Sequence, residues 1–123
     1  MNTLEKEFIP YEQALTLKEL GFDEPCFRVY DTLGFVQDEK VMDKLSLEKI
    51  QSPTFSQAFR WFREKYGLYH SIGLDNSLEN DVNCDYQIIN HSQSISEHET
   101  NFNNYEEAEL ACLKKLIEIV KNK

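Results

Sequence analysis

The spacing of apolar residues along the chain predicts three helices. The clearest one follows Ser52 and Pro53, a candidate N-cap and first helical residue, and ends at Gly67. Its apolar positions repeat at intervals of three and four residues and form one stripe: Phe55, Ala58, Phe59, Phe62 and Tyr66. Because aromatic side chains bury large areas, we expect this central helix to dominate the core.

The other two helices lie near the ends of the chain. One is predicted over residues 10–20, with Gly21 after its end and Phe22 folding back on Leu17 as in a Schellman motif. The other begins after Asn104, where Glu107 three positions later resembles a capping box, and it carries a broad apolar face to its end. Both therefore have an apolar side to bury.

Strand patterns occupy the regions between the helices. Apolar residues at 27–30 and 33–36 predict a hairpin whose turn lies at Asp31-Thr32 or at Gly34. Apolar and polar residues alternate at 68–74 and 82–88, which predicts a second antiparallel hairpin of half-buried strands. Residues 37–51 fit either a short helix or a packed loop, and the polar stretch 90–103 predicts a mobile loop.

These elements together predict the α+β class. The chain has 123 residues, which is the usual size of one domain. We therefore expect a single domain over residues 1–123, in which a small antiparallel sheet of three or four strands packs against the central and C-terminal helices.

The charge is strongly asymmetric along the chain. The net charge is −9, and no Lys or Arg occurs between Lys65 and Lys114, an interval that holds nine acidic residues. Such a chain repels phosphate groups, so nucleic-acid binding is not expected. No apolar run reaches the roughly 18–20 residues of a membrane helix, and the first residues lack the pattern of a signal peptide. We therefore expect a cytoplasmic protein with no membrane contact.

One spacing resembles a calcium site. Asp81, Asn83 and Asp85 match the first three ligands of an EF-hand loop, but Tyr86 replaces its glycine and Ser92 its final glutamate. The same spacing results from the alternation of a strand, so we expect no calcium there.

Other candidates for chemistry are weaker still. His91 and His98 lie in the polar segment with acids beside them, but no element fixes their geometry for zinc. Cys26 and His70 permit a nucleophile–base pair only if the fold brings them together, and no two cysteines form a CxxC motif. Glycine-rich phosphate loops are absent. We therefore predict no catalytic residue, metal or cofactor, and lean against an enzyme.

A candidate partner-binding site lies on the central helix. Trp61 falls at the edge of the apolar stripe, and Arg60, Arg63 and Lys65 surround it. Trp and Arg are the residues most enriched at protein-binding hot spots, so we expect this group to contact a protein partner or a second copy. The competing interpretation is a Trp packed inside the chain with Arg stems over its rim.

Three blocks carry a resemblance to known sequences. They are FIPYEQALTLKELGFDEPCF at 8–27, PTFSQAFRWFREKYGLYHSI at 53–72 and YEEAELACLKKLIEIVKNK at 105–123. The chain resembles, in these blocks, a group of short proteins of unassigned activity from Bacteroides-type gut bacteria and their phages and prophages. The resemblance implies an accessory protein of a phage or mobile element that acts in the bacterial cytoplasm, and it assigns no functional residue.

Two functions remain open from the sequence. The first is a non-enzymatic accessory protein that binds another protein. The alternative is an inhibitor that mimics nucleic acid, in which the acids from Asp75 to Glu109 face a basic host protein. The first should use the surface around Trp61 and Arg63, and the second should use a continuous acidic face.

Overall fold

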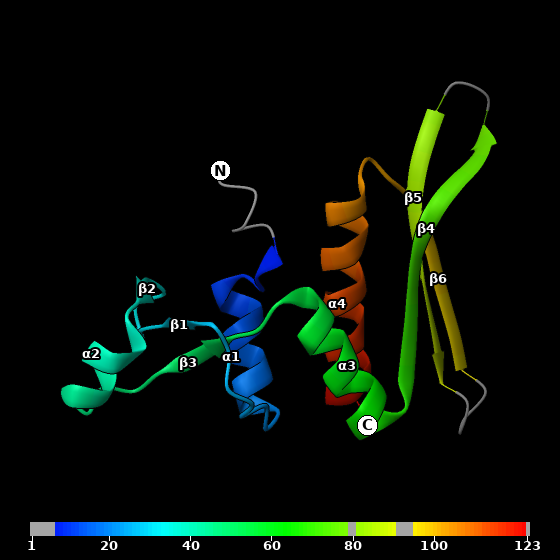
Figure 1. Ribbon diagram of the computed structural model, residues 1–123. Coiled ribbons are helices and arrows are strands. Elements are labelled where there is room, and N and C mark those ends of the chain that lie inside the picture. Colours follow the sequence, from blue (N-terminus) through cyan, green and yellow to red (C-terminus); the bar gives the residue numbers. More distant parts are fainter. Residues whose placement is uncertain (1–6, 79–80, 91–94, 123) are drawn as a thin grey trace. The chain divides into compact units, whose positions relative to one another are not determined.

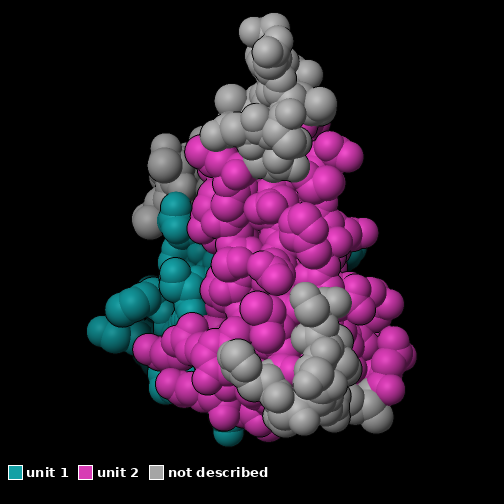
Figure 2. Space-filling model, turned by 90° about the vertical axis from the view of Figure 1, so that its right-hand side faces the viewer, with its two compact units in different colours: residues 1–58 teal, residues 59–123 magenta. Residues whose placement is uncertain are grey.

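The protein is an α+β protein with two small antiparallel sheets. The computed structural model describes residues 7–78, 81–90 and 95–122, which form four helices and two sheets of three strands each (Figure 1). The chain divides into two compact units, residues 1–58 and 59–123 (Figure 2). The predicted α+β class is therefore confirmed, although its strands form two sheets and not one.

The elements follow the chain in a simple order. Unit 1 holds α1 (Tyr11–Glu19), β1 (Arg28–Tyr30), β2 (Val36–Gln37), α2 (Glu39–Lys44) and β3 (Ile50–Ser52). Helix α3 (Phe55–Tyr66) crosses the boundary, and unit 2 continues with β4 (Leu68–Leu78), β5 (Asp81–Asn90), β6 (Ile95–Phe102) and α4 (Tyr105–Lys121). The expectation of one domain stays a prediction, since compact units of one chain can fold together.

The sheet of unit 1 has the order β2-β1-β3, with both pairs antiparallel. Strand alternation places Tyr30 on one face, where its ring meets the ring of Tyr11 from α1 at 5.5 Å. Val29 and Gln51 lie on the other face, where Gln51 donates to the carboxylate of Glu39 from α2. Helix α1 therefore packs on one face of the short sheet, and α2 is hydrogen-bonded to a side chain of the other face.

Helix α1 ends as the sequence predicts. Gly21 has a φ of 101°, and the N–H of Phe22 donates to the carbonyl of Leu17 at 2.9 Å. This is the hydrogen bond of a Schellman motif, for which glycine is suited because it adopts a positive φ without strain. Leu17 and Phe22 are both buried, so the chain reversal also closes part of the core.

The sheet of unit 2 has the order β4-β5-β6, and α4 packs along one face of it (Figure 1). The buried positions of β5 alternate with partly exposed ones, and at Cys84, Tyr86 and Ile88 this alternation is as predicted. Asn90 continues the buried side, although it was expected in a loop. Helix α4 supplies the facing residues of this core, Ala108, Cys112, Leu113, Leu116 and Ile117. Asn104 caps α4 through the N–H of Glu107 at 2.8 Å, again as predicted.

Helix α3 has the buried stripe expected of it, but it begins later. Phe59 and Phe62 are 3% and 0% exposed. The N–H of Gln57 donates to the hydroxyl of Thr54 at 3.1 Å, so Thr54 is the capping residue. The prediction that Ser52 caps the helix was wrong because Ser52 is the last residue of β3, paired with Arg28 of β1.

The predicted loop at 90–103 was largely wrong. Asn90 is the buried end of β5, and residues 95–102 form β6 along its other side. The polar sequence of residues 95–102 is compatible with a strand because an exposed edge strand needs no apolar alternation, and its backbone hydrogen bonds come from the neighbouring strand. Residues 91–94, including His91, lie outside the described part of the chain.

Candidate functional site

Exposed apolar side chains are concentrated in one stretch of unit 1. Among the described residues, seven of the ten large apolar side chains that are exposed lie within residues 27–47, which we call the apolar segment. They are Phe27, Leu33, Phe35, Val36, Val41, Leu45 and Leu47. Phe27 is 98% exposed and Leu33 is 79% exposed, so these side chains stand almost fully in solvent.

The turn between β1 and β2 fixes the first group of these side chains. The carboxylate of Asp31 accepts hydrogen bonds from the N–H groups of Leu33 and Phe35, at 2.9 and 3.0 Å. These hydrogen bonds also lower the pKa of Asp31. Gly34 has a φ of 90°, and the ring of Tyr11 lies directly against its α-carbon side. Leu33 and Phe35 are therefore exposed on a turn with its own hydrogen bonds.

Helix α2 fixes the second group. Asp38 caps it by accepting from the N–H groups of Lys40 and Val41. Met42 is 1% exposed, whereas Val41 and Leu45, four residues apart, are 51% and 61% exposed. This short helix therefore buries Met42, whereas the apolar side chains of Val41 and of Leu45, its C-cap residue, face solvent.

The candidate site around Trp61 does not have the accessibility that we expected. Trp61 is only 6% exposed, and its ring meets those of Phe62 and Tyr66 edge to face at 5.1 and 5.4 Å. The ammonium group of Lys65, one turn along the helix, lies 4.9 Å from the centre of the indole. The competing interpretation, a Trp packed within the chain, is the one that the structure supports.

The basic residues around Trp61 are placed differently. Arg60, Arg63 and Lys65 are all exposed on α3. A contact with an acidic surface is open to them, but a hot spot normally needs an apolar anchor at its centre. With Trp61 buried, that anchor is not available at this position.

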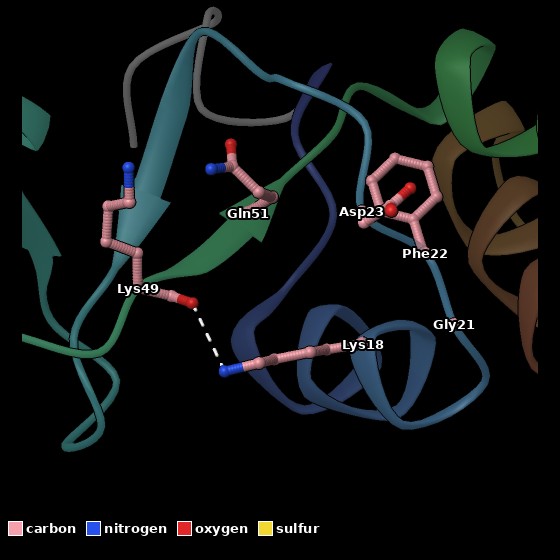
Figure 3. A pocket seen from close by; sticks show the side chains of 6 residues that line it. All are labelled: Lys18, Gly21, Phe22, Asp23, Lys49 and Gln51. Carbon is pink, nitrogen blue, oxygen red and sulfur yellow. Dashed lines mark hydrogen bonds between the residues drawn. The ribbon is translucent and has the colours of Figure 1, made fainter.

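A pocket of about 480 Å³ opens in unit 1 (Figure 3). It is lined by Lys18, Gly21, Phe22, Asp23, Lys49 and Gln51. Figure 3 shows Lys18 reaching the backbone carbonyl of Lys49, at 3.3 Å, while the ammonium group of Lys49 points away from it. Lys18 also pairs with Glu48, and Lys49 pairs with Asp43 at 2.7 Å. Because carboxylates already hold both ammonium groups, the pocket is a poor site for an anion.

The polar side chains of the second sheet are also engaged with one another. His98 lies 2.9 Å from a carboxylate oxygen of Asp85, and the hydroxyl of Tyr86 donates to Glu99 at 2.7 Å. The second bond explains how a tyrosine that is 1% exposed satisfies its hydroxyl. Both pairs join β5 to β6, so they hold an edge strand in place.

The cysteines lack the properties of nucleophiles. Burial raises the pKa of the thiols of Cys26 and Cys112 to about 12, and Cys84 is buried. A thiol must ionise to attack a carbonyl or to hold a metal, so at neutral pH neither Cys26 nor Cys112 is activated.

His70 is stacked flat on Phe59, with ring centres 3.8 Å apart. Burial, and then the charge of Arg63, lower the pKa of His70 below its usual value of about 6.5. The unfolded chain therefore takes up a proton at His70 more readily than the folded protein does. Stability from this residue is complete above about pH 6.5 and decreases as the pH falls toward the lowered pKa.

We expect the melting temperature of the wild type to fall more steeply between pH 7 and pH 5 than that of His70→Phe. Phenylalanine keeps the ring stacked on Phe59 and removes the titrating group, so the two curves differ by this residue alone. Circular dichroism melts across the pH range provide the measurement. Parallel curves would contradict the lowered pKa.

The exposure of the apolar segment has a signal in the sequence. Phe35 and Val36 are consecutive in an extended chain, so they point to opposite sides of the sheet. A two-residue edge strand has too little neighbouring structure to bury both. A short hairpin with apolar residues on both faces therefore predicts exposure, even though each residue alone looks like core.

The fold and the exposed surface define a small α+β protein with a segment of exposed apolar side chains. In the described residues, no group of three or more His, Cys, Asp and Glu side chains is arranged to hold a metal ion, and no helix is long and apolar enough to cross a bilayer. No family model, curated protein or solved structure matches the chain. The resemblance to the phage and Bacteroides-type proteins therefore stays a prediction.

Proposed function

We propose that this chain is a non-enzymatic accessory protein that binds another protein through the apolar segment 27–47. The observation that carries the proposal is the exposure of Phe27, Leu33 and Phe35, which are 98%, 79% and 64% exposed. The resemblance in the three sequence blocks suggests its setting, a phage or mobile element acting in the bacterial cytoplasm.

The physical argument is the cost of keeping these side chains in water. A monomeric soluble protein rarely exposes a large apolar patch, and patches of several hundred Å² usually mark a contact site. Burying a side chain of the size of Phe or Leu contributes about 1.5–3 kcal/mol. At their observed exposures, covering all seven residues contributes roughly 7–14 kcal/mol. This is the same range as the ~4–15 kcal/mol that association costs.

The surface is also held in a fixed shape before any partner arrives. Asp31 orders the turn that carries Leu33 and Phe35, and Asp38 caps the helix that carries Val41. Side chains on ordered backbone lose less entropy on binding than those on a mobile loop. This order favours a contact function over mere tolerance of exposed apolar residues.

The acidic mimic remains the alternative prediction. Its support is the interval from Lys65 to Lys114, which holds nine acidic residues and no Lys or Arg between those ends. Three carboxylates of this interval, however, already contact other groups of unit 2. Asp85 pairs with His98, Glu99 accepts from Tyr86, and Glu107 accepts from the N–H of Asn103. A mimic would bind a basic protein in competition with DNA, which gives the two proposals different tests.

Photo-crosslinking tests the proposed surface directly. With p-benzoylphenylalanine in place of Phe27 or Phe35, we expect covalent capture of one defined protein in the native host. The same group at Tyr69 or Tyr105, which are exposed in unit 2, is the matched control and should capture much less. A purified partner should then bind Phe27→Ser at least about tenfold more weakly, a loss of about 1.4 kcal/mol.

The stability of Phe27→Ser separates binding from folding. Because Phe27 is 98% exposed, its replacement should change the free energy of unfolding by less than about 0.5 kcal/mol. Equal capture from the segment and from the control positions would contradict the proposal. Partner binding that is abolished by DNA but unaffected by Phe27→Ser would favour the acidic mimic instead.

A further inference from the structure

We propose that the partner of the apolar segment is a second copy of this chain, in a two-fold symmetric dimer in which β2 lies antiparallel beside β2 of the other copy. This inference rests on the proposed function, because it names the occupant of the same surface. Three observations carry it: the apolar area, the charge of the segment and the edge position of β2.

The exposed apolar area is close to what a stable dimer needs. A standard interface buries about 800 Å² on each partner, of which about 65% is apolar in homodimers, or roughly 500 Å². Phe27 and Phe35 alone, at their observed exposures, offer roughly 250–400 Å². The five exposed aliphatic side chains raise the total to roughly 400–750 Å². The segment is therefore large enough to form the apolar part of such an interface.

The charge of the segment favours contact between identical copies. Residues 27–47 contain three basic and four acidic residues, so two segments can meet with little repulsion. The interval between Lys65 and Lys114 carries a charge of −9, and two such surfaces repel each other. Self-association through the apolar segment keeps the acidic intervals out of the contact. A strongly charged partner, by comparison, would find no complementary excess of charge here.

The edge position of β2 supplies the geometry. Among the described residues, β2 has a strand neighbour on one side only in the order β2-β1-β3, and the residues at this edge are Phe35, Val36 and Gln37. An edge strand without charges is a template for pairing, whereas β6 of the other sheet carries Glu97, His98 and Glu99 along its edge. A two-fold axis makes the β2 strands of the two copies antiparallel to each other. The strand pairs within this sheet are antiparallel as well.

The faces of the sheet are consistent with such a contact. Strand alternation puts Phe35 on the same side as Val29, which is the side on which Gln51 of β3 donates to Glu39 of α2. The exposed Val41 lies on that helix, and the exposed Leu45 directly follows it. Pairing of two β2 strands would bring these apolar side chains of both copies toward the symmetry axis.

The test is the oligomeric state of the wild type and of two variants that place opposite charges at residue 36. Sedimentation equilibrium of the wild type at micromolar concentration should give twice the chain mass of 14.5 kDa. Val36→Glu and Val36→Lys should each be monomeric, because a residue near the axis meets its own copy. Mixed together, the two variants should form a one-to-one heterodimer through opposite charges. Leu74→Glu and Leu74→Lys, at an exposed position of unit 2, are the controls and should remain dimeric.

A second variant, Phe27→Ser, tests the dimer in case the two Val36 variants do not fold. At protein concentrations low enough for this variant and the wild type to be monomeric, Phe27→Ser should melt like the wild type, because the Phe27 side chain does not contribute to the folded core. It should dimerise about tenfold more weakly. A monomeric wild type would overturn the inference, as would Val36 variants that stay dimeric or a mixture that stays monomeric. If the wild type is monomeric and crosslinks from Phe27 identify a different protein, the proposed function stands. If neither a dimer nor a crosslinked protein is found, both fail.

Discussion

Replacing Phe62 by alanine is expected to lower the free energy of unfolding by about 3–5 kcal/mol. Phe62 is fully buried, and its ring lies against Trp61 at 5.1 Å and Tyr66 at 6.1 Å. Removing the ring forfeits its transfer free energy and leaves a cavity that a helix surrounded by other aromatic rings cannot close. Small domains have only about 5–15 kcal/mol in total, so this variant should unfold at a much lower urea concentration.

The comparison for Phe62→Ala is Glu64→Ala, two residues along the same helix. Glu64 is exposed, so that substitution should change the free energy of unfolding by less than about 0.5 kcal/mol. Urea titration followed by circular dichroism gives the midpoint and the slope of both variants. A Phe62→Ala midpoint equal to that of the wild type would show that the aromatic stripe of α3 is not the core of this protein.

Leu17→Ala is expected to cost about 2–5 kcal/mol, the second largest effect. Leu17 is fully buried on α1 and packs where the chain reverses at Gly21. Its carbonyl accepts the N–H of Phe22, and Phe22 is itself 3% exposed. The substitution keeps that backbone hydrogen bond but removes the apolar contact that accompanies it, so the end of α1 should lose protection first.

Hydrogen exchange measures this second effect where it occurs. Amides of α1 should exchange faster in Leu17→Ala, while Leu17→Met, which nearly conserves volume, should cost less than about 1.5 kcal/mol. Glu19→Ala, on the exposed side of the same helix, serves as the comparison and should leave exchange unchanged. Unaltered protection of α1 in Leu17→Ala would refute the packing described for unit 1.

The exposed side chains of the apolar segment contrast with the buried Phe62 and Leu17. Phe62 and Phe27 are the same residue type, but one is fully buried and the other is 98% exposed. Hydrophobicity alone cannot distinguish them, because burial depends on which elements are near enough to cover a side chain. The surface that we propose for binding is therefore a property of the tertiary structure.

Local signals in the sequence determined α1, α3 and α4 and most of the strands, whereas for residues 37–51, which hold α2, they left a short helix and a packed loop open. Gly21 and Gly67 stop helices, and Asn104 starts one, because backbone conformation and capping are properties of a residue and its immediate neighbours. The alternation around Tyr86 predicted β5 for the same kind of reason, since a half-buried strand repeats every two residues. These features were predicted without any knowledge of distant contacts.

Only the tertiary structure decided the rest. Residues 95–102 are polar but form a strand, because β5 supplies the hydrogen bonds that the loop interpretation left out. Trp61 was expected to be an edge residue that contacts a partner, but it is only 6% exposed in the folded chain. Phe27, Phe35 and Val36 belong to the apolar pattern that predicts a hairpin, but they face solvent, because a sheet of two- and three-residue strands has too little surface to cover them.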